Sequence, residues 1–259
     1  MSRARPFPLH AGVAEVTAVV DLTPAMRRFT LAAEAFSGPG IEQPGEIITL
    51  GWPLNGEALV LPELGWRFPE GTPAAHWRNY TVRSFAPERA TLDVDFFLHG
   101  PLGHASAWAE TARPGATVGF AGPRVHWEPD PEAGWTLLAA DETGLPALLA
   151  IAEALPAGHR TVALAEVAGE QERQPLVSPA DLELHWVSRE GRAPGSTGVL
   201  LERLRALELP DGRGQAWGGG EALAMRDLRR HLQASRPGLD GSLRLLGYWK
   251  HDRTPADVY

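Results

Sequence analysis

A cation, an aromatic ring and a hydroxyl group stand within four positions of the segment RNYTVRSF, residues 78–85. On a strand, alternate side chains share a face, so Arg78 and Tyr80 point one way and Thr81 points the other. An arginine fits phosphate as a planar fork, and a tyrosine offers a flat surface. This set suits a ligand that has both a pyrophosphate and a planar ring. An exposed arginine beside a rim tyrosine, on an ordinary antiparallel strand, is the simpler interpretation of these residues taken alone.

A glycine-rich segment, VDFFLHGPLGHASAWAE, follows at residues 94–110. Gly100 and Gly103 let the backbone come close to a ligand. The pattern predicts a helix from about His104 to Thr111, whose free N–H groups point back at this loop and favour phosphate. Ser106 adds a hydroxyl in the first turn. A tight turn followed by a capped helix is the alternative interpretation.

Three more groups of polar residues follow predicted strands in the second half of the chain. Asp141, Glu142 and Thr143 come directly after an apolar run, and residues 217–221 read WGGGE. In open α/β sheets, ligands bind beyond the carboxyl ends of the strands. Arg189 also ends a strand and could meet an adenosine 2′-phosphate. A helix-capping threonine, a glycine-rich turn and a solvated arginine are the corresponding alternatives.

The first half of the chain must supply strands to hold the first two segments. Short alternating or β-branched runs separated by Pro and Gly turns predict a small barrel or sandwich. The segments 79–85 and 91–99 are expected to be antiparallel neighbours. The predicted strands cover residues 14–33 (as two runs), 45–52, 79–85, 91–99 and 116–123.

The second half of the chain has a different sequence pattern, and the proline- and acid-rich segment 127–134 is the expected boundary between two domains. Beyond it, strand and helix patterns alternate, which predicts an α/β unit with a mostly parallel sheet. The run WTLLAA is continuous and apolar, as in a strand buried on both faces. Predicted strands cover 135–140, 160–168, 182–189, 215–221 and 242–249, and predicted helices cover 145–155, 198–207 and 221–235.

Composition excludes several classes of protein. The 259 residues include no cysteine, so a disulfide scaffold, a thiolate metal site and a cysteine nucleophile are excluded. The formal net charge of -8 disfavours a nucleic-acid partner. The nine histidines form no metal-binding pattern, and no apolar run approaches the roughly 20 residues that span a bilayer. The first residues lack the apolar core of a secretory signal, so a cytoplasmic location is expected.

Taken in order, the motifs resemble the siderophore-interacting protein family, whose members are flavin-dependent ferric-siderophore reductases related to ferredoxin–NADP reductases. The first two segments match that family at Arg78, Tyr80, Thr81, His99, Gly100, Gly103, Ala105, Ser106 and Trp108. The likeness continues through LLAADETGLPALLAI (137–151), WVSRE (186–190), WGGGEALAMRDLRRHL (217–232) and GYWK (247–250). It covers nearly the whole chain, from roughly residue 10 to residue 250.

The resemblance implies an antiparallel six-stranded Greek-key β-barrel that binds FAD, over residues 1–126. A Rossmann-like α/β domain with a mostly parallel sheet, over residues 127–259, would bind NADPH or NADH. The substrate would be a ferric siderophore or another ferric chelate. The resemblance places Tyr80, Thr81 and Thr143 at the reaction centre, and Lys250 and Arg253 at the substrate. The implied cofactor-binding residues are Arg78, Tyr80, Thr81, Val82, Phe97, His99, Gly100, Gly103, Ala105, Ser106, Asp141, Glu142, Thr143, Arg189, Trp217, Gly218, Gly219, Glu221 and Tyr248.

Two alternatives stay open on the sequence. Family members often carry a lysine about where Thr49 stands, which would be a second cation for an anionic chelate. Its absence favours a related FAD-dependent reductase with another acceptor, such as a quinone, a free flavin or a redox protein. A non-catalytic barrel that reads nucleic acid is disfavoured by the net charge and by the lack of a basic, aromatic stripe.

Overall fold

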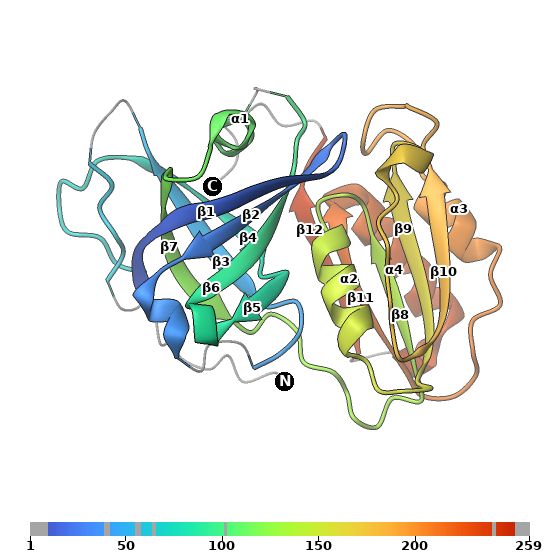
Figure 1. Cartoon of the computed structure of the whole chain (residues 1–259). Coiled ribbons are helices and arrows are strands. Elements are labelled where there is room, and N and C mark those ends of the chain that lie inside the picture. The colour runs from blue at the N-terminus through green and yellow to red at the C-terminus, as the bar shows by residue number, and fades with distance from the viewer. Residues whose placement is uncertain are drawn as a thin grey trace. The chain divides into compact units, whose positions relative to one another are not determined.

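The computed structural model describes residues 10–38, 42–54, 58–63, 66–100, 103–239 and 242–251. The chain divides into two units, the first ending at His126 and the second beginning at Trp127. Each unit has its own sheet (Figure 1). Each also has its own hydrophobic core.

A curled antiparallel sheet forms the first unit, with strand order β4-β3-β7-β1-β2-β6-β5. One α-helix, α1 (His104–Thr111), and two short 3-10 helices, η1 (Glu34–Ser37) and η2 (Pro87–Arg89), accompany it in the described part of the unit. The strands are β1 (Ala11–Thr23), β2 (Met26–Ala32), β3 (Ile47–Pro53), β4 (Ala75–Thr81), β5 (Ser84–Ala86), β6 (Thr91–Phe97) and β7 (Thr117–Arg124).

The sheet has seven strands where the sequence predicted six, because the segment RNYTVRSF belongs to two of them. Strand β4 ends at Thr81 and pairs with β3, whereas β5 begins at Ser84 and pairs with β6. The two residues between them bond to different neighbours: the Val82 N–H donates to the Glu46 carbonyl and the Arg83 N–H donates to the Asp93 carbonyl, both at 2.8 Å. Since β4 and β5 stand at opposite ends of the strand order, this short connection brings the two ends together and curls the sheet.

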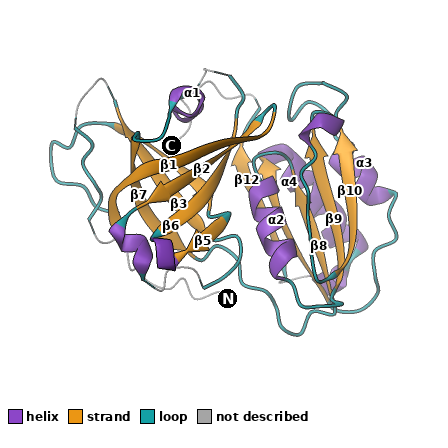
Figure 2. Ribbon diagram, viewed as in Figure 1, coloured by secondary structure: helices purple, strands orange, loops and turns teal. Residues whose placement is uncertain are grey.

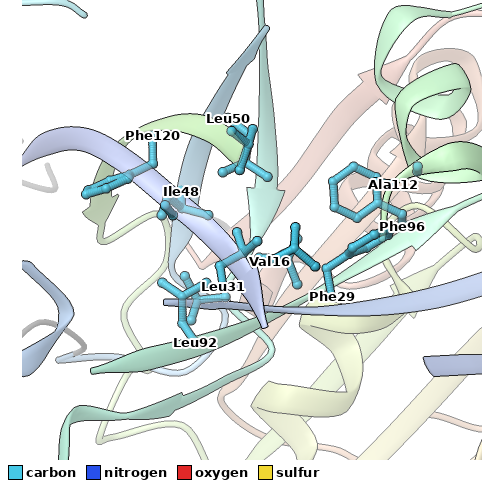
Figure 3. Packing of buried hydrophobic residues seen from close by; sticks show 14 of the residues in the cluster. Val16, Phe29, Leu31, Ile48, Leu50, Leu92, Phe96, Ala112 and Phe120 are labelled. Carbon is cyan, nitrogen blue, oxygen red and sulfur yellow. The ribbon is translucent and has the colours of Figure 1, made fainter. Parts of the chain in front are cut away.

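The core of the first unit follows from alternation along the strands. Leu92, Val94 and Phe96 of β6 point inward and are at most 1% exposed. They meet side chains from the other strands in one cluster, which includes Phe29 and Phe120 (Figure 3). Phe29 and Phe96 pack edge to face with ring centroids 5.0 Å apart. This packing fixes which face of each neighbouring strand is available to a ligand.

A five-stranded parallel sheet forms the second unit, in the order β10-β9-β8-β11-β12. This confirms the predicted α/β class, and every pair in the sheet is parallel. The strands are β8 (Trp135–Ala140), β9 (Arg160–Val167), β10 (Asp181–Ser188), β11 (Gly214–Glu221) and β12 (Leu243–Trp249). The helices are α2 (Leu145–Ala154), α3 (Val199–Arg205) and α4 (Ala222–Ser235), with 3-10 turns η3 (Glu170–Glu172) and η4 (Pro237–Leu239).

Helices cover both faces of this sheet, as Figure 2 shows. Two successive residues of β8 illustrate the division: Leu137 packs with α3 and α4, while Leu138 packs with α2. All six residues of β8 are buried, as its unbroken apolar run predicted. Within the described residues, no helix combines the length and the apolar character needed to cross a bilayer.

Candidate functional site

Arg78 and Tyr80 lie on the core-facing side of β4. They stand opposite the buried residues Leu50 and Ile48 of β3. The Tyr80 ring stacks on Phe96, with centroids 4.1 Å apart and planes inclined by 27°. Burial raises the pKa of Tyr80, so its hydroxyl stays protonated. The Arg78 guanidinium donates a hydrogen bond to the Trp77 carbonyl oxygen at 2.8 Å.

Helix α1 meets this face of β4 through aromatic contacts. The His76 ring, two positions before Arg78, stacks on His104 at the start of α1 with centroids 3.8 Å apart. Phe96 links the two elements as well, since its ring lies 5.7 Å from that of Trp108. Burial, together with His104 and Arg78, lowers the pKa of His76 and favours the neutral ring. His76 was not predicted as a site residue from the sequence, although strand alternation places it on the same face as Arg78 and Tyr80.

Ser106 is the clearest sign that this region is built for a ligand. It lies in the first turn of α1, is 3% exposed, and its hydroxyl has no hydrogen-bond partner among the residues that the structure describes. A buried hydroxyl left without a partner costs about 1–3 kcal/mol. The helix begins after Gly103, and Gly100 adopts a left-handed conformation with φ +89. An anionic group that accepts from Ser106 at this helix start would satisfy the hydroxyl.

The other predicted residues of the first unit are distributed around this site. Thr81 is buried on the opposite face of β4, and Val82 is 4% exposed in the connection to β5. Ala105 packs against the core. Phe97 ends β6 with its ring 6.1 Å from that of the exposed His99. The structure thus joins Arg78, Tyr80, Ala105 and Ser106 through β4, β6 and α1, and puts Thr81 on the other side of the strand.

Arg124 brings a cation to the outer face of the sheet, the side turned away from the core. From the end of β7 its guanidinium donates to Thr49 Oγ1 at 2.6 Å and to Asn79 Oδ1 at 2.7 Å. The Thr49 hydroxyl also donates to Asn79 Oδ1 at 2.7 Å. Thr49 stands where the family often has a lysine. Here the guanidinium of Arg124, from another strand, is hydrogen-bonded to the Thr49 hydroxyl. No local motif pointed to Arg124, because its neighbours come from strands distant in sequence.

In the second unit, Asp141 is the centre of a hydrogen-bond cluster at the carboxyl edge of the sheet. It is 5% exposed, and its Oδ1 accepts from the Thr143 N–H at 2.8 Å and the Thr143 hydroxyl at 2.5 Å. Its Oδ2 accepts from the Glu221 N–H and from Trp249 Nε1, both at 2.8 Å. The Glu221 carboxylate in turn caps α4, accepting from the N–H groups of Leu223 and Ala224. The cluster brings together three predicted residues, Asp141 and Thr143 after β8 and Glu221 at the end of β11. Trp249 of β12, which was not predicted as a site residue, completes it.

Glu142 and Arg189 form a buried pair beside this cluster. Two guanidinium nitrogens of Arg189 donate to the two Glu142 oxygens at 2.7 Å each, and Nη1 also lies 3.4 Å from Glu166 Oε1. Arg189 is 1% exposed. This differs from the prediction that Arg189 would meet a nucleotide phosphate, because two carboxylates surround its guanidinium. Burial raises the pKa of Glu166 to about 7; Asp141 and Glu142 add to the rise, while Arg189 opposes it.

The glycines of WGGGE lie inside β11, and protein atoms fill the space beside them. A Cβ on Gly219 would come 2.9 Å from the Tyr248 ring, and one on Gly220 would come 2.8 Å from Asp141 Oδ2. A Cβ on Gly218 would press on the Ala139 carbonyl oxygen. Trp217 is 2% exposed in the core under α2. These glycines therefore let the chain approach itself, where the sequence suggested approach of a ligand.

Lys250 follows β12 and is exposed, and its contact with substrate stays a prediction. Arg253, its predicted companion, lies outside the described residues. Across the ranges that the structure describes, no three His, Asp or Glu side chains gather as metal ligands.

A curled antiparallel sheet followed by an α/β unit with a parallel sheet is the architecture of ferredoxin reductase-like proteins. A cytochrome P450 reductase from Amycolatopsis shares this fold, with a TM-score of 0.68 at 18% identity over 93% of this chain and 70% of that one. A siderophore utilization protein from T. fusca is more similar: the TM-score is 0.87 at 35% identity, over 98% of both chains.

Residues 15–127 match the family model described as siderophore-interacting FAD-binding domain, and residues 133–252 match the one described as siderophore-interacting protein. The chain belongs to the siderophore-interacting protein family. It is 30% identical to the ferric acinetobactin reductase of Acinetobacter baumannii, over 79% of this chain and 72% of that protein. An uncharacterised protein of Mycobacterium tuberculosis is 36% identical over 68% of this chain, and the alignment spans 66% of that relative.

Proposed function

We propose that this protein is an FAD-dependent reductase that uses NADH or NADPH to reduce Fe(III) held in a siderophore or a related chelate. Family membership and the reductase relatives support this class of reaction. The observation that carries the proposal is the buried, unpartnered hydroxyl of Ser106 beside the Arg78–Tyr80 face of β4. A flavin dinucleotide has the phosphate that would meet it.

The residues present fit FAD. The Arg78 guanidinium and the start of α1 provide two positive ends for a pyrophosphate, and Ser106 provides a neutral donor. Tyr80, already held flat against Phe96, gives a planar surface for a ring system. The chemistry that FAD supplies when bound is the conversion of a two-electron hydride transfer into single-electron transfers to Fe(III). The protein contributes binding, orientation and charge.

A ferric chelate with oxygen donors is usually anionic, so the protein must place cations where it binds. Arg124 provides one on the outer face of the first unit, held by Thr49 and Asn79. Lys250 and Arg253 remain proposed contacts from the second unit. Fe(II) is a softer ion than Fe(III) and is held less firmly by hard oxygen ligands, so reduction releases the metal.

Thr143 is the proposed nicotinamide contact in the second unit. It is a partly exposed member of the Asp141 cluster, and both its N–H and its hydroxyl are fixed by the Asp141 carboxylate. The other members of that cluster bond mainly to one another. We therefore assign Asp141 and Glu221 the task of holding the sheet edge in shape.

Titration with FAD tests the cofactor site, using the wild-type protein and Ser106→Ala. The variant should keep or gain stability without FAD, since it removes an unsatisfied group, and should bind FAD about 5–10-fold more weakly. Anaerobic addition of NADH or NADPH to the FAD-loaded protein should then bleach the flavin spectrum. A protein that takes up no FAD would refute the proposal.

A reductase with another acceptor is the second candidate, motivated by the missing lysine at Thr49. Steady-state rates with ferric chelates, quinones, free flavin and ferricyanide decide between them. The proposal expects the highest kcat/KM for ferric chelates and a loss of that preference in Arg124→Ala.

A further inference from the structure

Three histidines gather around the start of helix α1, on the side where Arg78 lies. His76 of β4 stacks on His104, the first residue of the helix, with ring planes inclined by 27°. His99 approaches from the segment after β6, since a Cβ on Gly103, the residue before the helix, would lie 3.5 Å from its ring carbon Cε1. Arg78 follows His76 by two positions on β4, so the two side chains share a face. We call His76, His99 and His104 the histidine cluster.

No carboxylate balances the histidine cluster within the part of the chain that the structure describes. None of its members forms an ion pair or a hydrogen bond with an acidic side chain there. Strand β3, the partner of β4, has no ionisable side chain. On β6, Asp93 and Asp95 alternate with the inward residues and are hydrogen-bonded to other side chains on the outer face. Glu110 comes six positions after His104 on α1, more than one turn further along the helix.

Protonation of this cluster is coupled to its charged neighbours. Burial is the largest effect that lowers the pKa of His76, and His104 and Arg78 lower it further because each disfavours another positive charge. An anion at the start of α1 would oppose the effect of these neighbours, since it favours the charged form of every cation around it. The hydroxyl of Ser106 is buried and has no partner among the described residues, which marks this helix start as a place for an acceptor. Binding of an anion and binding of a proton should therefore strengthen each other here.

We propose that His76 and His104 bind the pyrophosphate of FAD together with Arg78 and take up a proton as they do so, so that the protein holds its cofactor more tightly as the pH falls. This inference rests on the proposed function and states how pH regulates that site. The pyrophosphate of a dinucleotide stays fully ionised near neutral pH, so the proton passes from solvent to the imidazole pair. Two charged rings stacked with centroids 3.8 Å apart would repel each other, so the pair takes up about one proton and not two.

Calorimetric titration of FAD into the full chain at pH 6, 7 and 8 measures the affinity at each pH. Repeating the titration in buffers of different ionisation enthalpy gives the number of protons taken up, a readout that is independent of activity. The variants His76→Gln and His104→Gln keep a polar side chain that cannot ionise. His104→Arg places a permanent charge at the exposed helix start. His231→Gln on α4, in the second unit, is the matched control.

Wild type should take up about half a proton for each FAD bound at pH 7, and its affinity should fall about 10-fold from pH 6 to pH 8. Each glutamine variant should reduce that fall to less than about 3-fold, whereas His231→Gln should follow wild type. His104→Arg should bind FAD at pH 8 about as tightly as wild type does at pH 6.

Binding of FAD by wild type without proton uptake would overturn this inference and leave the proposed function standing. The same holds for a pH dependence that persists unchanged in both glutamine variants. Because the proton count is measured on wild type, the first of these results does not depend on how well any variant folds. A wild-type chain that takes up no FAD at any of the three pH values would overturn the proposed function and this inference together.

Discussion

Replacing Glu166 by glutamine should change how the stability of the protein depends on pH. Glu166 is 5% exposed near the end of β9, in contact with Arg189 and close to Asp141 and Glu142. Its pKa is raised by burial from 4.5 to about 7. The folded state therefore holds this proton more tightly than the unfolded state, in which the carboxyl has its ordinary pKa. Glutamine keeps the shape of the protonated side chain and cannot ionise.

The sign of the effect follows from that comparison. Because the folded-state pKa is the higher one, the contribution of Glu166 to stability is fully present below pH of about 4.5 and is lost as the pH rises through about 7. At about 1.4 kcal/mol for each pH unit between the two values, the full contribution is about 3 kcal/mol. Most of it disappears between pH 5 and pH 8.

Urea unfolding, followed by tryptophan fluorescence and circular dichroism at pH 5, 6, 7 and 8, measures the free energy of unfolding. From pH 5 to pH 8 the wild-type protein should lose about 2–3 kcal/mol more than Glu166→Gln loses, and the variant should be the more stable one at pH 8. Glu208→Gln, at an exposed position after α3, is the control and should follow wild type. If the free energy of unfolding changed with pH in parallel for wild type and Glu166→Gln, the argument that burial raises the pKa of this carboxyl would be refuted.

Three further predictions concern the cofactor site and the packing of the second unit. Tyr80→Ala and Arg78→Ala should each weaken FAD retention at least 10-fold in equilibrium dialysis. Arg83→Ala should weaken it less than 3-fold, because the Arg83 guanidinium lies 4.0 Å from the Asp95 carboxylate and not beside Tyr80. Equal losses in all three variants would argue against FAD binding at the Arg78–Tyr80 face of β4. Gly144→Ala should destabilise the protein by about 3 kcal/mol or more in urea unfolding, because the new methyl group overlaps the Gly219 carbonyl. Gly134→Ala, where the nearest atom is 3.5 Å away, should cost less than about 1 kcal/mol, and a similar cost at both glycines would contradict the packing. Trp249→Phe should cost about 1–2 kcal/mol through the lost hydrogen bond to Asp141, and an unchanged midpoint would show that this bond contributes nothing.

Much of the fold could be predicted because its signals are local. The buried run WTLLAA became β8, and the helix over 145–155 became α2 with Pro146 in its first turn. The division of RNYTVRSF between β4 and β5 could not be predicted, since it depends on which strands stand at the two ends of the sheet order. The sequence shows where extended chain is favoured, whereas pairing is decided by partners far away.

Prediction of the candidate site from the sequence was limited in the same way, by contacts between residues distant in the chain. Arg78 and Tyr80 could be placed on one face by alternation alone. A glycine in a strand signals a close approach, yet only the structure shows that Tyr248 and Asp141 make that approach in β11. An arginine at the end of a strand likewise indicates a positive charge that a ligand could use. Only the structure shows that two carboxylates surround the Arg189 guanidinium, Glu166 from β9 and Glu142 from the segment after β8. In both cases long-range packing determines the environment of the residue.

The Asp141 cluster has a consequence for the order in which the second unit folds. Its hydrogen bonds reach Glu221, 80 residues away, and Trp249, 108 residues away. Contacts of such sequence separation carry a large loop-closure cost and are expected to form late. Weakening the cluster should therefore speed unfolding while leaving the folding rate nearly unchanged. On this basis, Asp141 determines how long the native sheet edge lasts once formed, and chevron kinetics of Trp249→Phe would measure it.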